Sequence, residues 1–103
     1  MDERTYSKYF KAFGDPSRLR ILSLLSCKEM TVNEITKAVG LSQPTVSRHL
    51  AILREAEIVA DRREGQQVHY SLDKRAVETC CQGFCNGLAI RLRVPGKDKK
   101  RRK

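Results

Sequence analysis

Three cysteines fall within six residues near the end of the chain, in the segment Thr79-Cys-Cys-Gln-Gly-Phe-Cys85. The rest of the sequence contains one other cysteine, Cys27. Thiolates are soft ligands that favour thiophilic ions over hard ones. Three of them without a histidine beside them suit the trigonal pyramidal coordination of As(III) or Sb(III). The spacing therefore predicts a metalloid site formed by Cys80, Cys81 and Cys85.

Two other chemistries are compatible with the same thiols. One alternative is a soft divalent ion, Cd(II), Pb(II) or Zn(II). Cd(II) or Zn(II) would require a fourth ligand, and Cys27 is the one spare thiol. A thiol redox or reactive-sulfur sensor is the second alternative, although a disulfide between the neighbours Cys80 and Cys81 would strain the peptide that links them. Cys27 follows a run of leucines and is expected to be a buried core thiol.

Helix geometry constrains how the three sulfurs could meet. Cys81 and Cys85 are four residues apart and share one face of a regular helix. Cys80 lies about 140° around from Cys85, at about 100° per residue. Glycines at 83 and 87 weaken this helix, which is expected to kink or end between residues 82 and 88. Binding by all three thiols therefore requires the backbone to unwind around Gly83.

The composition predicts one small domain in the cytoplasm. The chain has 103 residues, of which 40% are hydrophobic. It contains no apolar run of about 18 residues that could span a membrane, and no apolar signal core follows Met1. Cysteines in a reducing compartment are more plausible as ligands or sensors than as structural disulfides. No phosphate-binding glycine loop, paired carboxylates or Cys-His arrangement stands out, so an enzyme is not expected.

The positive charge is concentrated at the end of the chain. The formal net charge is +9, and residues 91–103 hold eight Lys or Arg against one Asp. This imbalance divides the chain into a folded domain, residues 1–90, and a basic tail, residues 91–103. Such a run is usually a solvated, disordered end, and an arm that contacts phosphates is the alternative.

Capping signals delimit four short helices before residue 57. Residues 3–13 carry one aromatic face and stop at Gly14, and Asp15-Pro16 begins the next helix. The aromatic residues of that face are Tyr6, Tyr9, Phe10 and Phe13. Thr31 and Glu34 form a capping box for a short helix that Gly40 ends. Its inward-facing residues are expected to be Val32, Ile35, Ala38 and Val39.

Ser42 caps the fourth helix, which is expected to bury Val46, Leu50 and Leu53. The hydrophobic period then changes from 3.6 to 2 over residues 58–63 and 67–72, which predicts a β-hairpin before the last helix. Two short helices joined through Gly40-Leu41 and followed by a hairpin form a winged helix-turn-helix. The fold class is therefore mainly α with a β-hairpin wing.

The outer side of the fourth helix has the composition of a DNA-reading surface. Short hydroxyl and amide side chains with one guanidinium can bind base edges and phosphates. Its residues are Ser42, Gln43, Thr45, Ser47 and Arg48. Arg62, Arg63 and Gln66 flank the predicted wing and could reach the DNA backbone or minor groove. His49 borders the buried face and is expected to pack or contact phosphate rather than bind metal.

Three segments resemble the ArsR/SmtB family of winged-helix, metal-responsive repressors. They are Phe13–Leu22, Leu41–Ala56 and Arg62–Leu72 within a similarity that extends over roughly residues 5–75. The resemblance implies a homodimer built from the first and last helices, which binds a palindromic double-stranded operator and represses until an inducer binds.

The sensor positions known in that family can be checked against this sequence. The Cys-x-Cys that some arsenite sensors carry before the recognition helix has no counterpart in Met30–Ile35. The histidines that zinc sensors carry on the last helix are absent, since none follows His69. Some relatives carry arsenite-binding cysteines in the C-terminal region. The resemblance thus points to As(III) or Sb(III) as the inducer ligand at Cys80, Cys81 and Cys85.

Overall fold

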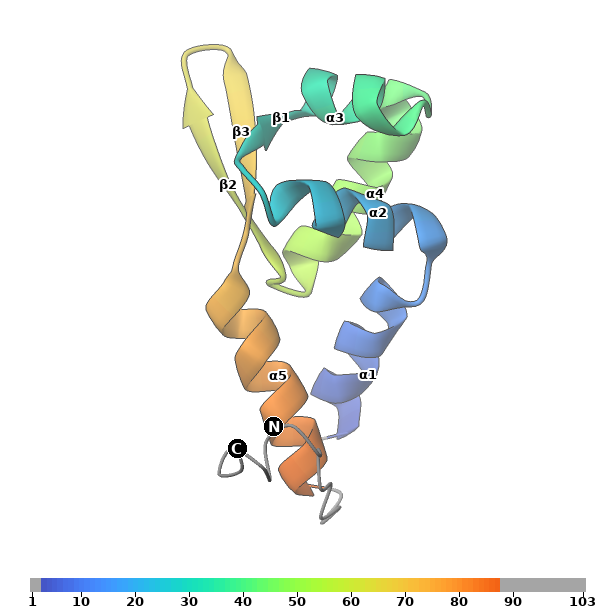
Figure 1. The fold of residues 1–103 in the computed structure, drawn as a ribbon, viewed down its shortest axis with the longest axis vertical. Coiled ribbons are helices and arrows are strands. Elements are labelled where there is room, and N and C mark those ends of the chain that lie inside the picture. Colours follow the sequence, from blue (N-terminus) through green and yellow to red (C-terminus); the bar gives the residue numbers. More distant parts are fainter. Residues whose placement is uncertain (1–2, 88–103) are drawn as a thin grey trace, which may run out of the picture.

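The computed structural model describes residues 3–87. Two helices, α1 (Glu3–Phe13) and α5 (Lys74–Gly87), lie side by side at one end of the molecule (Figure 1). The other end holds α2 (Pro16–Leu25), α3 (Val32–Val39), α4 (Gln43–Glu55) and a small sheet. The basic tail predicted for residues 91–103 lies outside the described residues, as do residues 88–90.

The predicted capping residues form the helix ends as expected. The Asp15 carboxylate accepts a hydrogen bond from the Arg18 amide at 3.0 Å, which begins α2. Thr31 and Glu34 exchange the two bonds of a capping box at the start of α3. Gly40 ends α3 in the left-handed conformation with φ 73°, which is accessible to glycine without strain. The sharp turn it allows leads directly into α4.

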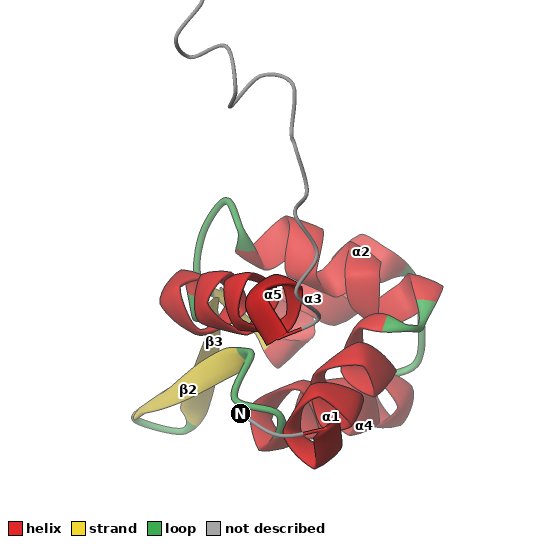
Figure 2. Ribbon diagram, turned by 90° about the horizontal axis from the view of Figure 1, so that it is seen from below, coloured by secondary structure: helices red, strands yellow, loops and turns green. Residues whose placement is uncertain are grey.

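The sheet has three antiparallel strands in the order β1-β3-β2. The wing consists of β2 (Val59–Glu64) and β3 (Gln67–Leu72), joined by a turn with Gly65 at φ 63°. Each wing strand was predicted to within one residue. The edge strand β1 (Met30–Thr31), which pairs with Tyr70 and His69, was not predicted. Seen from below, β2 and β3 lie together at one side of the helices (Figure 2).

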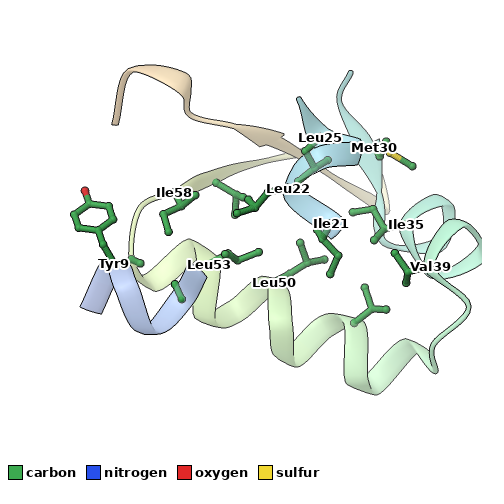
Figure 3. Close-up of a cluster of buried hydrophobic side chains, with 14 of the residues drawn as sticks. Tyr9, Ile21, Leu22, Leu25, Met30, Ile35, Val39, Leu50, Leu53 and Ile58 are labelled. Atoms are coloured by element: carbon green, nitrogen blue, oxygen red, sulfur yellow. The ribbon is translucent and has the colours of Figure 1, made fainter. Parts of the chain in front are cut away.

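One core lies between α2, α3, α4 and the sheet (Figure 3). The predicted core residues Val46, Leu50 and Leu53 of α4 are all fully buried. They are joined by Ile21, Leu22, Leu25, Ile35, Val39 and Ile58. The fold is the predicted winged helix-turn-helix, and the buried side of α4 packs against the core.

Two predictions of burial were wrong. Ala38 is exposed, because the inner face of α3 is set by Ile35 and Val39, four residues apart. Cys27 is exposed rather than buried, because α2 ends at Leu25 and leaves Cys27 in the following turn. Its sulfur lies 3.9 Å from the Ser23 carbonyl oxygen.

Candidate nucleic-acid interface and sensor site

The predicted DNA-reading residues lie on the solvent side of α4. Gln43, Ser47 and Arg48 are exposed, and Thr45 is half-buried. Ser42 is exposed and engaged at the helix start: its hydroxyl accepts from the Thr45 amide at 3.4 Å and donates to the Thr45 hydroxyl at 2.9 Å. The first turn of α4 therefore presents oriented polar groups, and the helix dipole makes this end favourable for phosphate.

A network centred on Arg18 fixes α4 against the preceding helices, and sequence reasoning missed it. The Arg18 guanidinium donates to the Ala12 carbonyl at 2.8 Å, to the Lys11 carbonyl at 3.1 Å and to His49 Nδ1 at 3.1 Å. Arginine only donates, so Nδ1 accepts and the imidazole proton lies on Nε2, 3.9 Å from Asp15. His49 is thus a packed residue that helps to position α4.

On the wing, the two predicted arginines differ in their surroundings. Arg62 forms ion pairs with Glu29 at 2.6 Å and Glu64 at 3.0 Å, although its side chain remains 52% exposed. These carboxylates raise the pKa of Arg62, and the hydrogen bond from Arg62 lowers the pKa of Glu29. Arg63 takes no part in these pairs and is exposed, as is Gln66 at the turn. The charge of Arg62 is therefore partly neutralised before any DNA arrives.

The three cysteines of α5 occupy different surroundings. Cys80 is fully buried, Cys81 is exposed and Cys85 is half-buried. Burial, followed by the neighbouring Cys81 thiol, raises the pKa of Cys80. Within residues 3–87 no three His, Cys, Asp or Glu side chains are grouped closely enough to hold a metal ion. The helix continues through Gly83 without a break, so the three sulfurs do not converge here.

The aromatic residues of α1 meet α5 through Phe84, which was not among the predicted site residues. The Phe84 ring lies edge-on to Tyr6 at 5.4 Å and to Phe10 at 4.6 Å between centroids. Tyr9 is buried, whereas Phe10 stays 40% exposed. The contact could have been predicted from the sequence, because position 84 of the predicted last helix carries an aromatic side chain.

A helix-turn-helix with an exposed polar recognition face and a β-wing defines a winged-helix DNA-binding regulator. A family model described as "Bacterial regulatory protein, arsR family" matches residues 15–61, which extend from α2 into the wing. The transcriptional repressor SdpR of Bacillus subtilis is 42% identical over 77 residues, 75% of this chain and 86% of that protein. The chain belongs to the ArsR family and is a transcriptional repressor of that family.

Two further similarities bear on the fold and the site. The arsenic resistance transcriptional regulator ArsR1 of Pseudomonas putida is 52% identical over 64 residues, which are 61% of this chain and 50% of that protein. The crystal structure of NolR from Sinorhizobium fredii superposes with a TM-score of 0.69 at 32% identity, over 81% of this chain and 83% of that one. Among the described residues, no helix is long and apolar enough to cross a membrane.

Proposed function

We propose that this repressor binds a palindromic operator as a homodimer and releases it when As(III) or Sb(III) binds Cys80, Cys81 and Cys85. The observation that carries the proposal is the presence of all three thiols on α5, the helix that packs against the aromatic face of α1. A ligand that reshapes α5 would disturb this packing and hence the placement of two recognition helices.

The DNA-binding half of the proposal rests on α4 and the wing. The residues assigned to DNA are Ser42, Gln43, Thr45, Ser47, Arg48, Arg62, Arg63 and Gln66. Gln43 can pair with adenine and Arg48 with guanine, while the hydroxyls bind phosphates or bases. The exposure of Gln43 and Arg48 beside the capped start of α4 supports a base-reading role for both.

The part of the proposal that concerns dimerisation rests on the surface formed by α1 and α5. Phe10 is 40% exposed even though its ring contacts Phe84, so aromatic surface remains available to a second copy of the chain. A small domain buries a limited fraction of its surface by folding alone, so association would add to its stability. The expected oligomer is a dimer in which these two helices meet their symmetry mates.

The choice of metalloid follows from the ligand set. Three thiolates satisfy As(III) or Sb(III), whereas Cd(II) or Zn(II) would need a fourth ligand. One of the relatives, ArsR1, is named for arsenic resistance and SdpR is not, so similarity alone does not assign the inducer. The second candidate is a thiol redox or reactive-sulfur sensor, which the exposed thiol of Cys81 favours.

A DNA-release titration tests the proposal. The preferred DNA sequence is first selected from a random pool, and the complex is titrated with arsenite, antimonite, cadmium, zinc and a persulfide donor. Release by arsenite and antimonite, lost when Cys80, Cys81 or Cys85 is replaced by serine, supports the metalloid site. Release by the persulfide donor alone would establish the redox alternative instead.

A further inference from the structure

The two faces of α5 separate the three cysteines. Cys81 and Cys85 lie four residues apart, so their sulfurs project from neighbouring positions on one side of the helix. Cys80 points to the other side and belongs to the same buried core cluster as Tyr9 of α1. A ligand arriving from solvent therefore meets two thiols first.

Close packing between α1 and α5 keeps Cys80 covered. A Cβ atom placed on Gly83 would lie 3.0 Å from the hydroxyl oxygen of Tyr6, so the backbone of α5 passes directly beneath that side chain. Phe84, one residue further along, contacts Tyr6 and Phe10 through its ring. Cys80, Gly83 and Phe84 thus form the α1-facing side of α5, and Cys80 has no route outward while this contact persists.

We propose that Cys80 is a concealed third ligand, which the metalloid reaches only when α5 separates from α1. This inference rests on the proposed function. Arsenous acid, As(OH)₃, first exchanges two hydroxyls for the sulfurs of Cys81 and Cys85, releasing two waters. The third hydroxyl leaves as water when the Cys80 thiol gives up its proton and forms the last As–S bond. Arsenic stays in the +3 state throughout, and no electrons are transferred.

The order in which the As–S bonds form determines when the structure of the protein changes. The first two As–S bonds leave the α1–α5 contact intact, because Cys81 is exposed, Cys85 is half-buried and neither belongs to the buried core. The third bond removes Cys80 from the core, leaves a void beside Tyr9 and requires the turn at Gly83 to unwind. A void among packed side chains destabilises the contact that surrounds it. DNA release therefore follows the third bond and not the first two.

Phenylarsine oxide separates the two stages, since its arsenic keeps one bond to carbon and can take only two thiols. The experiment uses the full chain with Cys27→Ser, because Cys27 is exposed and would react independently. Alkylation of each cysteine by N-ethylmaleimide is followed by mass spectrometry, alongside release of the selected DNA. Without ligand, Cys80 should react about 100-fold more slowly than Cys81. Phenylarsine oxide should protect Cys81 and Cys85 and leave the DNA bound, whereas arsenite should release it.

Four outcomes would overturn the inference, and they point to different faults. Alkylation of Cys80 as fast as Cys81 would show that the thiol is not concealed. DNA release by phenylarsine oxide equal to release by arsenite, or unchanged release by arsenite with Cys80→Ser, would show that two thiols suffice and leave metalloid sensing standing. Failure of arsenite to protect any cysteine or release DNA would overturn the proposed function together with the inference.

Discussion

The guanidinium of Arg18 donates to His49 Nδ1 across 3.1 Å and joins α2 directly to the recognition helix α4. The same side chain donates to the last carbonyls of α1, at Lys11 and Ala12. Arg18 thus connects α1, α2 and α4 through side-chain hydrogen bonds. If the proposed inducer displaces α1, these bonds give a short path to α4.

Replacement of Arg18 should loosen that junction. Arg18→Ala removes the three side-chain hydrogen bonds and is expected to lower the free energy of unfolding by about 1–3 kcal/mol. It should also weaken operator binding, because α4 loses the hydrogen bond that joins its His49 to α2. Arg20→Ala is the matched control on the same helix, since Arg20 makes a single bond of 3.5 Å to the Ala38 carbonyl. Urea unfolding of both variants tests this, and equal losses would contradict the role assigned to Arg18.

Arg48 should contribute sequence specificity. Arg48→Ala is expected to weaken binding to the selected DNA by about 1–3 kcal/mol and to change binding to random DNA much less. Arg54→Ala is a suitable control, because Arg54 lies in the last turn of α4 and faces Asp61 at 4.0 Å. Fluorescence anisotropy with both DNAs measures the difference. Equal losses on the two DNAs would reassign Arg48 to phosphate contact.

The neighbouring wing arginines should behave differently. Arg63→Ala is expected to reduce DNA affinity and the slope of log affinity against log salt, since each phosphate contact contributes to that slope. Arg62→Ala should have the smaller effect, because Glu29 and Glu64 already hold its guanidinium. Glu29→Gln should partly free Arg62 and strengthen binding at low salt. Salt titrations decide the matter, and a larger effect at Arg62 than at Arg63 would refute the prediction.

Stability should fall in alkaline solution through two buried groups. Burial raises the pKa of Cys80 above its ordinary 9.0, and burial together with Cys80, Glu57 and Asp73 raises the pKa of Tyr9 above 10.0. The unfolded chain therefore loses these protons first. The contribution of these two groups to the free energy of unfolding is fully present below their ordinary pKa values. It is lost as the pH rises through those values towards the raised pKa values of the folded state. Urea midpoints from about pH 8 to about pH 11 should decline, and less steeply for Cys80→Ala.

Gly83 should set how much inducer is needed. Gly83→Ala favours the helix by about 1 kcal/mol. The added Cβ would lie 3.0 Å from the Tyr6 hydroxyl oxygen, so the Tyr6 ring has to shift slightly to admit it. Because the proposed site requires α5 to unwind before Cys80 can reach the metalloid, the variant should require about fivefold more arsenite for DNA release. Gln82→Ala alters an exposed neighbour and serves as the control. Identical arsenite midpoints for wild type and Gly83→Ala would argue against unwinding at this glycine.

Helix ends and the winged helix-turn-helix could be predicted because their signals are local. The cap at Asp15, the box formed by Thr31 and Glu34 and the αL turn at Gly40 each depend on residues within one turn of the chain. All three were confirmed. The burial of one side of α4 followed from apolar spacing in the same way.

Features that depend on distant pairing could not be predicted in this way. The two-residue strand β1 exists only because β3 accepts it in register, and it has no periodicity of its own. The neutralisation of Arg62 requires Glu29, which lies far away in sequence. The junction at Arg18 likewise depends on the approach of three helices. Cys27 was placed wrongly because α2 ends at Leu25, which leaves Cys27 in the following turn with its side chain exposed.

The strand order has a consequence for solubility. With β3 in the middle of the sheet, β2 is an edge strand whose outer backbone groups have no strand beside them among the described residues. An open edge is a template for strand addition by other chains, which leads to aggregation. Residues 61–64 of this edge are Asp, Arg, Arg and Glu, all exposed. These charged side chains discourage a second wing from adding to this edge.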